Sequence, residues 1–331
     1  MGFFVPFTFL VLLVIKMTVN KPKLIFMGTP NFARIILEKI HDSGFYDIVA
    51  VYAQPDKPVG RGGKLSSPPV AVFAKSHNLT LKQPIKIREP QVLGELKAFE
   101  ADIIVVAAYG KILPREALTA ARVDCLNVHA SLLPKYRGAA PINHAILNDE
   151  KQTGVAIMRV VEALDAGPVY AERALLIGED EDASTLTEKL AHLGVGLLLE
   201  TLPAILNGEK NPCEQNSVLA TYASKLDKTL SPINWNRPAR EIFNQIRALV
   251  PWPVAETALN GKRIKVYRSR PLTEFAHGRP GEIVHIGKLG WTVAAKDHNI
   301  LITDVQLEGK KRMSASDLAN GLRLSVGAVL S

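Results

Sequence analysis

The sequence has few of the features that mark disulfide-stapled modules and metal proteins. Its 331 residues include only two cysteines, Cys125 and Cys213, which lie far apart and belong to no CxxC motif or Cys/His cluster. Neither a disulfide framework nor a zinc site is supported, so we expect no bound metal and a reducing, cytoplasmic environment. Because Cys125 lies within an apolar run, we interpret it as a small core residue rather than as a nucleophile.

Long hydrophobic runs are also scarce, and the chain has no short-period repeat or low-complexity tract. It is long enough for two domains with proper cores. The apolar run at residues 3–15 is too short for a transmembrane helix and lacks the basic start and small-residue cleavage site of a secretory signal. We interpret residues 1–20 as a dispensable extension, with translation starting at Met17 as one reading, and expect no membrane association. A membrane anchor is the alternative.

Acidic charge is scarce in the last third of the chain. Residues 221–331 contain 17 of the 40 basic residues and only 9 of the 32 acidic ones, whereas residues 1–220 contain 23 of each. The whole net charge of +8 therefore lies in the last third. A basic module that follows a neutral one indicates a polyanionic partner. A basic surface that serves solubility alone is the alternative.

Short apolar runs alternate with helical patterns over the first part of the chain. We predict strands at 23–28, 47–53, 101–108 and 124–129, and helices at 32–43, 69–77, 90–100 and 114–121. Thr29 followed by Pro30 predicts the N-cap and the first residue of the first helix. Strands that alternate with helices are typical of a parallel α/β sheet.

The pattern changes after Thr153. We predict strands at 153–160 and 168–177, a helix at 184–206, a second helix at 238–249, a hairpin around Asn260-Gly261, and further strands at 281–287, 290–295 and 299–307. The fold class is therefore α/β, with a Rossmann-like parallel sheet in an N-terminal domain and a small, OB-like β-barrel at the C-terminus. We place the domains at 21–207 and 231–331, with a linker at 208–230.

Two polar residues stand at the end of one predicted strand. Asn127 and His129 project from the same side, because side chains alternate along a strand. Ligands of open α/β sheets bind at the carboxyl ends of the strands. Asp165 follows in a Gly/Pro turn, from which a carboxylate could reach and charge the histidine. Taken alone, His129 is better explained as a structural histidine whose hydrogen bonds are satisfied, and the surrounding residues favour a functional one.

In several segments the sequence resembles the folate-dependent formyltransferases. The segments that carry the resemblance are NVHASLLPKYRGAAPI at 127–142, ALDAGPV at 163–169, LIFMGTPNFA at 24–33, QPDKPVGRGGKLSSPPV at 54–70, AYGKILP at 108–114 and PWPVAET at 251–257. They occur in the family's order, and the similarity as a whole covers the chain from about residue 22 to its end.

The resemblance implies a reaction and roles for the three polar residues. The formyl group of 10-formyltetrahydrofolate would pass to the α-amino group of methionyl initiator tRNA through a tetrahedral intermediate. Asn127 would donate to the developing oxyanion, and His129, charged by Asp165, would add a cationic donor. Asp165, directly or through a water molecule, would also remove the proton of the attacking amine.

The resemblance also implies two sets of binding residues. The folate pocket would be mostly apolar, with main-chain groups holding the pterin; its walls would be Ser131, Leu132, Leu133, Pro134, Tyr109, Gly110 and Ile112. Leu132 and Leu133 could instead be plain core. The loop at 54–69, which the glycines and prolines predict to be neither strand nor helix, would enter the tRNA acceptor stem with Lys57, Arg61 and Lys64. A solvated surface loop is the alternative.

Other functions fit the sequence less well. The GxGxxG glycines of a dinucleotide site are missing after the first strand, which disfavours an oxidoreductase. A nucleic-acid-binding module without chemistry would leave Asn127, His129 and Asp165 unexplained. Formyltransferases that act on a sugar nucleotide or a purine precursor share these three residues, but the 54–69 loop and the basic C-terminal domain favour tRNA. We expect a monomer.

Overall fold

The computed structural model describes residues 21–59 and 64–331. The prediction for the extension at 1–20 and that for Arg61 thus lie outside the described residues. The chain forms two compact units. Among the described residues, unit 1 comprises residues 21–59, 64–127 and Leu202–Lys210, and unit 2 comprises Val128–Thr201 and Asn211–Ser331.

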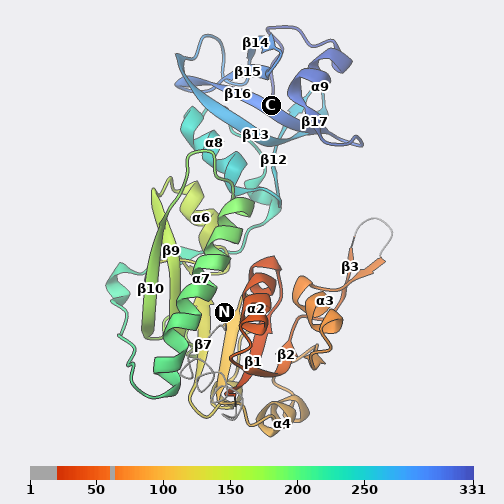
Figure 1. Ribbon diagram of the computed structural model, residues 1–331. Helices are drawn as coiled ribbons and strands as arrows, with labels where there is room; N and C mark the ends of the chain where they lie inside the picture. The colour runs from red at the N-terminus through yellow and green to blue at the C-terminus, as the bar shows by residue number, and fades with distance from the viewer. Residues whose placement is uncertain (1–20, 60–63) are drawn as a thin grey trace, which may run out of the picture. The chain divides into compact units, whose positions relative to one another are not determined.

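Unit 1 is built on a parallel sheet with the strand order β7-β6-β1-β2-β5 (Figure 1). The strands are β1 (Lys23–Gly28), β2 (Asp47–Tyr52), β5 (Leu81–Lys82), β6 (Ile103–Ala107) and β7 (Asp124–His129, of which the last two residues begin unit 2). Its helices are α2 (Asn31–Ser43), α3 (Pro69–Ser76), α4 (Pro90–Ala98) and α5 (Arg115–Leu118). Strands β1 and β6 are almost wholly buried, as expected for a parallel sheet covered on both faces.

The strand order of unit 1 reverses between β1 and β6. The chain runs outward from β1 to β2 and β5, and then returns to the other side of β1 with β6 and β7. Ligands of doubly wound sheets bind at the carboxyl ends of the strands beside such a reversal. Gly28 ends β1 there, and a Cβ on it would lie 2.6 Å from the Cβ of Ala33 and 2.9 Å from the carbonyl oxygen of Ala107. Only glycine fits this close approach.

The predicted start of the first helix is wrong by one residue. Helix α2 begins at Asn31, its N-cap is Pro30, and no side chain caps it. The hydroxyl of Thr29 does not cap the helix because it donates instead to the carbonyl oxygen of Tyr109, at 2.9 Å. A long-range partner has thus replaced the local one that the sequence predicted.

The prediction that the 54–69 loop contains no strand is also wrong. Two short antiparallel strands, β3 (Lys57–Val59) and β4 (Lys64–Ser66), pair through three residues each and project beyond α3 (Figure 1). The base of this hairpin is fixed by Asp56, which accepts hydrogen bonds from Gln83 Nε2 and Ser67 Oγ, both at 2.8 Å. These bonds hold the pKa of Asp56 below its ordinary value. Cross-strand pairing accommodates Pro58, which lies within β3 opposite Leu65.

Unit 2 begins within β7 and continues the sheet with β9 and β10, in the order β10-β9-β7. Its first part contains β8 (Arg137–Gly138), α6 (Pro141–Leu147), β9 (Gln152–Arg159), β10 (Val169–Leu176), α7 (Ala183–Leu206, of which the last five residues belong to unit 1), η1 (Ser217–Leu219), β11 (Tyr222–Ala223) and η2 (Lys228–Leu230). Strands β9 and β10 are antiparallel, and β8 pairs in parallel with β11.

Helix α7 is the one helix in the described part of the chain that is long and apolar enough to cross a membrane, by length and composition only. Half of its most apolar stretch is buried inside the protein, and a core helix passes the same test. A Cβ on Gly194 would lie 2.8 Å from the side chain of Val128. The helix therefore packs as part of the core.

The C-terminal part of unit 2 forms a separate antiparallel sheet with the order β12-β13-β16-β15-β14, to which β17 adds beside β16 (Figure 1). Its elements are α8 (Ala239–Ala248), β12 (Ala255–Leu259), β13 (Lys262–Phe275), β14 (Ile283–Gly287), β15 (Gly290–Ala294), β16 (His298–Leu307), β17 (Met313–Ser314) and α9 (Ala315–Leu322). The predicted hairpin at Asn260-Gly261 is confirmed, with φ values of 51° and 74°.

The last residues of the chain close this sheet into a barrel. Ser331 exchanges two main-chain hydrogen bonds with Ala258 of β12, at 2.8 and 3.0 Å. On its other side, the same segment bonds Gly281 and Ile283 at the start of β14. The barrel core includes Trp235 and Trp291, both buried. The predicted fold class, a Rossmann-like parallel sheet with a separate antiparallel C-terminal module, is thus confirmed.

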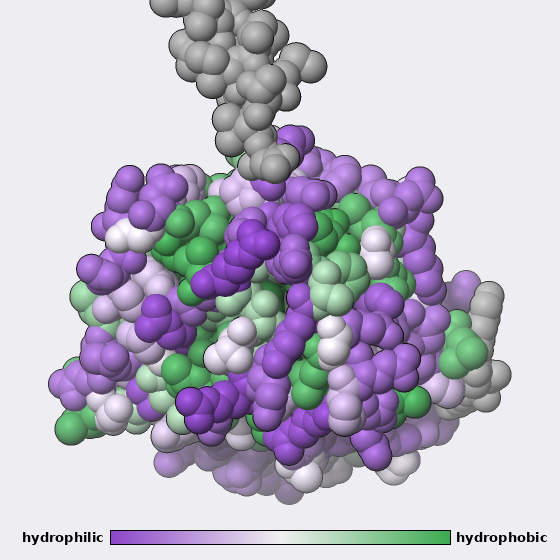
Figure 2. Space-filling model, turned by 90° about the horizontal axis from the view of Figure 1, so that it is seen from below, coloured by the Kyte–Doolittle hydropathy of each residue, from purple (hydrophilic) through white to green (hydrophobic). Residues whose placement is uncertain are grey.

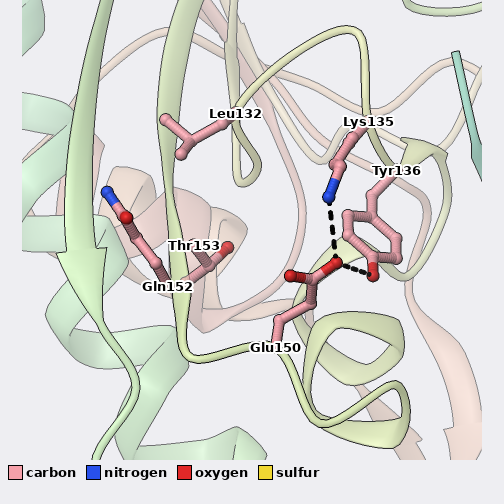
Figure 3. A pocket seen from close by; sticks show the side chains of 6 residues that line it. All are labelled: Leu132, Lys135, Tyr136, Glu150, Gln152 and Thr153. Carbon is pink, nitrogen blue, oxygen red and sulfur yellow. Dashed lines mark hydrogen bonds and ion pairs between the residues drawn. The ribbon is translucent and has the colours of Figure 1, made fainter. Parts of the chain in front are cut away.

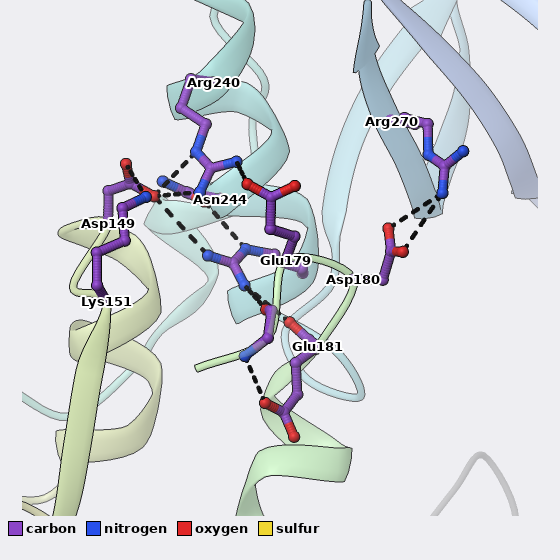
Figure 4. A network of polar contacts seen from close by, with 10 residues as sticks. Asp149, Lys151, Glu179, Asp180, Glu181, Arg240, Asn244 and Arg270 are labelled. Carbon is purple, nitrogen blue, oxygen red and sulfur yellow. Dashed lines mark hydrogen bonds and ion pairs between the residues drawn. The ribbon is translucent and has the colours of Figure 1, made fainter. Parts of the chain in front are cut away.

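A partly buried polar network holds α8 to the first part of unit 2 (Figure 4). Arg240 donates to Asp149 Oδ1 from Nε at 2.9 Å and from Nη2 at 2.6 Å. Arg247, which is buried, donates from Nη1 to the carbonyl oxygens of Gly178 and Glu181 at 3.2 and 3.0 Å. Burial lowers the pKa of Arg247. Burial opposes ionisation of Asp149, but its hydrogen bonds outweigh burial and lower its pKa to about 2.

The face shown in Figure 2 is mostly hydrophilic, with hydrophobic residues in small separate patches rather than in one broad area. Single exposed apolar side chains are normal on globular proteins.

Candidate active site

Asn127 and His129 occupy the end of β7. Asn127 pairs with Val106 near the end of β6, which places it beside the loop that begins at Ala108. Its side chain is partly exposed and makes no hydrogen bond to any residue that the structure describes. The amide N–H groups of Asn127 are therefore free to donate to a ligand.

The imidazole of His129 is 5% exposed and has protein partners on both nitrogens. Nε2 lies 3.0 Å from the carbonyl oxygen of Tyr136. A carbonyl only accepts hydrogen bonds, so Nε2 must carry a proton. Nδ1 lies 3.7 Å from Asp165 Oδ2, and the two form an ion pair when the ring carries a second proton there. The structure thus brings together the two residues that the sequence placed 36 positions apart.

Asp165 sits in the turn between β9 and β10 with a φ of 47°, a left-handed conformation that aspartate tolerates better than most residues. Its Oδ2 accepts a hydrogen bond from the main-chain N–H of Gly138 at 2.8 Å. Its Oδ1 has no hydrogen-bond partner among the residues described. One carboxylate oxygen is therefore held by the fold, and the other is available to a water molecule or a substrate.

Tyr136 is held in place by contacts at both ends of the residue. Its φ is 59°, and its main-chain N–H donates to Thr221 Oγ1 at 2.9 Å. Its hydroxyl donates to Glu150 Oε1 at 2.8 Å (Figure 3). The same hydroxyl accepts from Asn148 Nδ2 at 3.1 Å. Burial, with the hydrogen bond to Glu150, raises the pKa of Tyr136 to about 12. These contacts fix the position of Tyr136, whose carbonyl oxygen is the partner of His129 Nε2.

Two further residues tie the loops of the site together, and our reading of the sequence missed both. Arg137 is 4% exposed, and its Nε and Nη2 donate to Gln215 Oε1 at 3.1 and 2.7 Å. Gln215 Nε2 donates to the carbonyl oxygens of Asp165 and Gly167 at 2.9 and 2.7 Å. Arg137 lies inside the motif at 127–142 and could have been singled out there. Gln215 lies in the predicted linker, where no pattern marked it.

The predicted folate residues after β7 differ in exposure. Ser131 is buried, and its hydroxyl donates to the carbonyl oxygen of Lys135 at 2.7 Å. Leu133 packs with buried residues of β9, whereas Leu132 is partly exposed. Leu132 also lines a cavity of about 220 Å³ with Lys135, Tyr136, Glu150, Gln152 and Thr153 (Figure 3). Pro134 is partly exposed. The core reading thus fits Leu133, and Leu132 is accessible to a ligand.

The predicted folate residues after β6 belong to unit 1. The carbonyl oxygen of Tyr109 accepts from Thr29 Oγ1 and from Gln54 Nε2, at 2.9 and 3.1 Å, which fixes the loop. The ring of Tyr109 is buried, and burial raises the pKa of its hydroxyl. Gly110 has a φ of 80°, and the side chain of Ile112 is 70% exposed. A constrained main chain beside an exposed apolar side chain fits a flat heterocycle with polar edges.

Of the residues predicted to bind tRNA, Lys57 is exposed at the start of β3, and Lys64 is the first residue of β4. No cluster of three or more His, Cys, Asp or Glu side chains that could hold a metal occurs among residues 21–59 and 64–331. Cys125 is buried, which raises the pKa of its thiol and agrees with its interpretation as a core residue.

Comparison with known proteins identifies the class that this fold and site define. The family model for formyl transferase matches residues 22–202, and that for the formyl transferase C-terminal domain matches residues 225–323. The two matches cover well over half of the chain. The chain belongs to the formyl transferase family and is an enzyme that transfers a one-carbon group.

Relatives that match nearly the whole chain narrow the class. The chain is 43% identical over 311 residues to methionyl-tRNA formyltransferase of Halalkalibacterium halodurans, which covers 93% of this chain and 98% of the relative. It is 42% identical over 300 residues to methionyl-tRNA formyltransferase of Staphylococcus aureus, with coverage of 90% and 96%. Within the family, the chain groups with the methionyl-tRNA formyltransferases.

Solved structures share the fold. HypX from Aquifex aeolicus in complex with tetrahydrofolic acid gives a TM-score of 0.66 at 16% identity, over 93% of this chain and 48% of that one. An N-formyltransferase from Helicobacter canadensis in complex with folinic acid and dTDP-3-aminofucose gives 0.65 at 23% identity, over 85% and 98%. At these identities the likeness concerns the fold alone.

Proposed function

We propose that the protein transfers the formyl group of 10-formyltetrahydrofolate to the α-amino group of methionyl initiator tRNA for translation initiation. The observation that carries the proposal is the pairing of His129 with Asp165, at the end of the strand that also contains Asn127, within a chain that matches methionyl-tRNA formyltransferases over 93% of its length. A sugar nucleotide is a less favoured acceptor, because the full-length relatives above, which include the C-terminal domain, act on tRNA by name.

The reaction needs a neutral amine, a polarised formyl group and a place for a negative oxygen. The amine nitrogen attacks the formyl carbon, and the C=O π electrons move to the oxygen. The amine then loses a proton, the bond between N10 and the formyl carbon breaks, and N10 is reprotonated. Asp165 Oδ1 has no partner among the described residues, and we assign to it the removal of the proton from the amine, directly or through water.

We assign the stabilisation of the oxyanion to Asn127 and His129. The free amide of Asn127 donates directly, and one such donor is worth about 3 kcal/mol in the barrier. His129 adds positive charge when Asp165 pairs with its Nδ1–H. Its Nε2–H is engaged by the carbonyl oxygen of Tyr136, at 3.0 Å, so donation to the substrate requires that this N–H be shared or released.

The remaining assignments concern binding. Ser131 to Pro134 and the loop of Tyr109, Gly110 and Ile112 would hold the folate, mainly through main-chain groups. The segment 54–69, with Lys57, Arg61 and Lys64, would contact the acceptor stem, and the basic domain at 231–331 would contact other phosphates. The catalytic domain would be 21–207 and the linker 208–230. We propose a cytoplasmic monomer.

The test is a formylation assay with radiolabelled formyl donor and three acceptors: methionyl initiator tRNA, methionyl elongator tRNA and an amino-sugar nucleotide. We expect rapid formylation of the initiator tRNA only. Formylation of the sugar nucleotide, or of neither tRNA, would contradict the proposal.

A further inference from the structure

The segment between the two regions that match the family models is hydrogen-bonded to the loops that carry the candidate catalytic residues. Cys213 and Val169 exchange two main-chain hydrogen bonds, each of 2.8 Å. Further along, Tyr222 and Ala223 form β11, which pairs with Arg137 and Gly138 in β8. We call residues 211–224 the strap. One of its ends therefore holds the strand after Asp165, and the other holds the loop after His129.

Gln215 is the side chain of the strap that joins the two loops directly. A glutamine amide has two donors and two acceptor lone pairs. Both donors go to main-chain carbonyl oxygens, of Asp165 at 2.9 Å and of Gly167 at 2.7 Å, and the amide oxygen accepts two bonds from Arg137. The hydrogen-bonding capacity of Gln215 is thus fully used.

Arg137 depends on this contact. Its side chain is buried, and no carboxylate pairs with it in the described part of the chain. Buried charges are normally paired, and an uncompensated one costs considerable free energy. The amide oxygen of Gln215 is the only hydrogen-bond partner of the guanidinium among the described residues. Loss of Gln215 would therefore disturb both loops at once.

The two loops carry the groups whose separation matters for the chemistry. Gly138, next to Arg137, donates its main-chain N–H to Asp165 Oδ2, and that oxygen lies 3.7 Å from His129 Nδ1. A Cβ on Gly138 would lie 2.6 Å from the carbonyl oxygen of Ala223 in the strap, so this approach also requires glycine. We infer that Gln215 is a positioning residue that sets the distance between the carboxylate of Asp165 and the imidazole of His129. The inference rests on the proposed function.

Three substitutions distinguish an effect on the position of the Asp165 carboxylate from an effect on the stability of the fold. Gln215→Met keeps the length of the side chain but removes all four hydrogen bonds. Gln215→Glu can still accept from Arg137, but its carboxylate cannot donate to the two carbonyl oxygens. Glu214→Ala, at the exposed neighbouring residue, is the control. Each is measured by thermal unfolding and by steady-state formylation of methionyl initiator tRNA, in the wild-type and in the Asp165→Asn background.

We expect Gln215→Met to lower kcat about 10- to 100-fold, with KM for both substrates within about threefold of wild type. The kcat of Gln215→Glu should fall by a similar factor, because this variant lacks the N–H donors to the carbonyl oxygens of Asp165 and Gly167. In the Asp165→Asn background, Gln215→Met should cost less than about twofold, because the carboxylate it positions is already gone.

Several results would overturn the inference. They are a kcat of Gln215→Met within about twofold of wild type, full activity of Gln215→Glu, or an equal loss of kcat in both backgrounds. An active wild-type enzyme with any of these results overturns the role of Gln215 alone. A wild-type enzyme that formylates no tRNA contradicts the proposed function and, with it, this inference.

Discussion

The site around His129 and the hairpin β3–β4 are built in opposite ways. His129 is 5% exposed, and His129, Asp165 and Tyr136 are all held through contacts to main-chain groups. The hairpin has two strands of three residues, an exposed Lys57, and a Leu65 that is 66% exposed. Groups that stabilise a transition state must be preorganised, whereas groups that contact a phosphate backbone need only charge and reach. The comparison therefore predicts that substitutions in the site around His129 lower kcat. Substitutions in the segment that forms the hairpin should instead lower the affinity for tRNA.

The largest expected effect is that of His129→Ala, which removes the cationic group. We expect kcat to fall about 10³-fold. The matched control is His144→Ala, because His144 Nε2 also contacts a main-chain carbonyl oxygen, that of Ser224, at 3.0 Å. Steady-state formylation assays should show near-wild-type kcat for the control. If both variants lose kcat equally, the loss reflects the missing hydrogen bond to the main chain and not the chemistry.

Asn127→Ala is the next largest change, since it removes the free amide donor beside β6. Removal of one oxyanion donor lowers kcat about 10²-fold while leaving the ground state little changed. Rapid-quench formylation at saturating substrates measures this step. A large rise in KM for the folate with an unchanged kcat would instead assign Asn127 to binding.

Arg61→Ala, and more weakly Lys57→Ala, should raise KM for methionyl initiator tRNA, by about tenfold for Arg61, and spare folate binding. The slope of log affinity against log salt concentration should become shallower by about 1 unit for each phosphate that the variant no longer neutralises. Lys39→Ala, at an exposed lysine of α2, serves as the control. An effect of Arg61→Ala confined to folate affinity would show that the hairpin has been assigned to the wrong substrate.

The smallest expected effect concerns Asp149, which binds Arg240 and should influence stability but not chemistry. Its folded-state pKa of about 2 lies below its ordinary value of 3.8, so its carboxylate stabilises the fold above about pH 4. This stabilisation is lost as the pH falls from about 4 to about 2. Chemical unfolding of wild type and Asp149→Asn over this range should show a difference in unfolding free energy that shrinks at low pH. A constant difference would mean that Asp149 is not charged in the network.

Local patterns in the sequence predicted most of the fold. Buried runs predicted β1, β2, β6 and β7 to within two residues, and Asn260-Gly261 predicted a hairpin, because each depends on its own residues. The two-residue strand β5 was not predicted. Features that depend on distant partners were missed or misread. Thr29 bonds Tyr109 rather than its own helix, and the strands β3 and β4 form because they pair with each other.

The candidate site shows the same division. The alternation of a strand and a Gly/Pro turn were enough to single out Asn127, His129 and Asp165, and the structure places Asp165 beside His129. The contacts of Tyr136 with Thr221, and of Arg137 with Gln215, join segments about 80 residues apart. No spacing or composition signals such contacts, because a single polar residue in a polar segment has many equivalent neighbours.

The most direct measurement is the single-turnover rate of formyl transfer by wild type and by Asp165→Asn, with both substrates saturating. Asparagine keeps an oxygen that can accept from Gly138, so the fold should persist, but it neither pairs with the imidazolium nor takes a proton. The account predicts a rate at least about 100-fold lower for Asp165→Asn. Equal rates for the two proteins would contradict it.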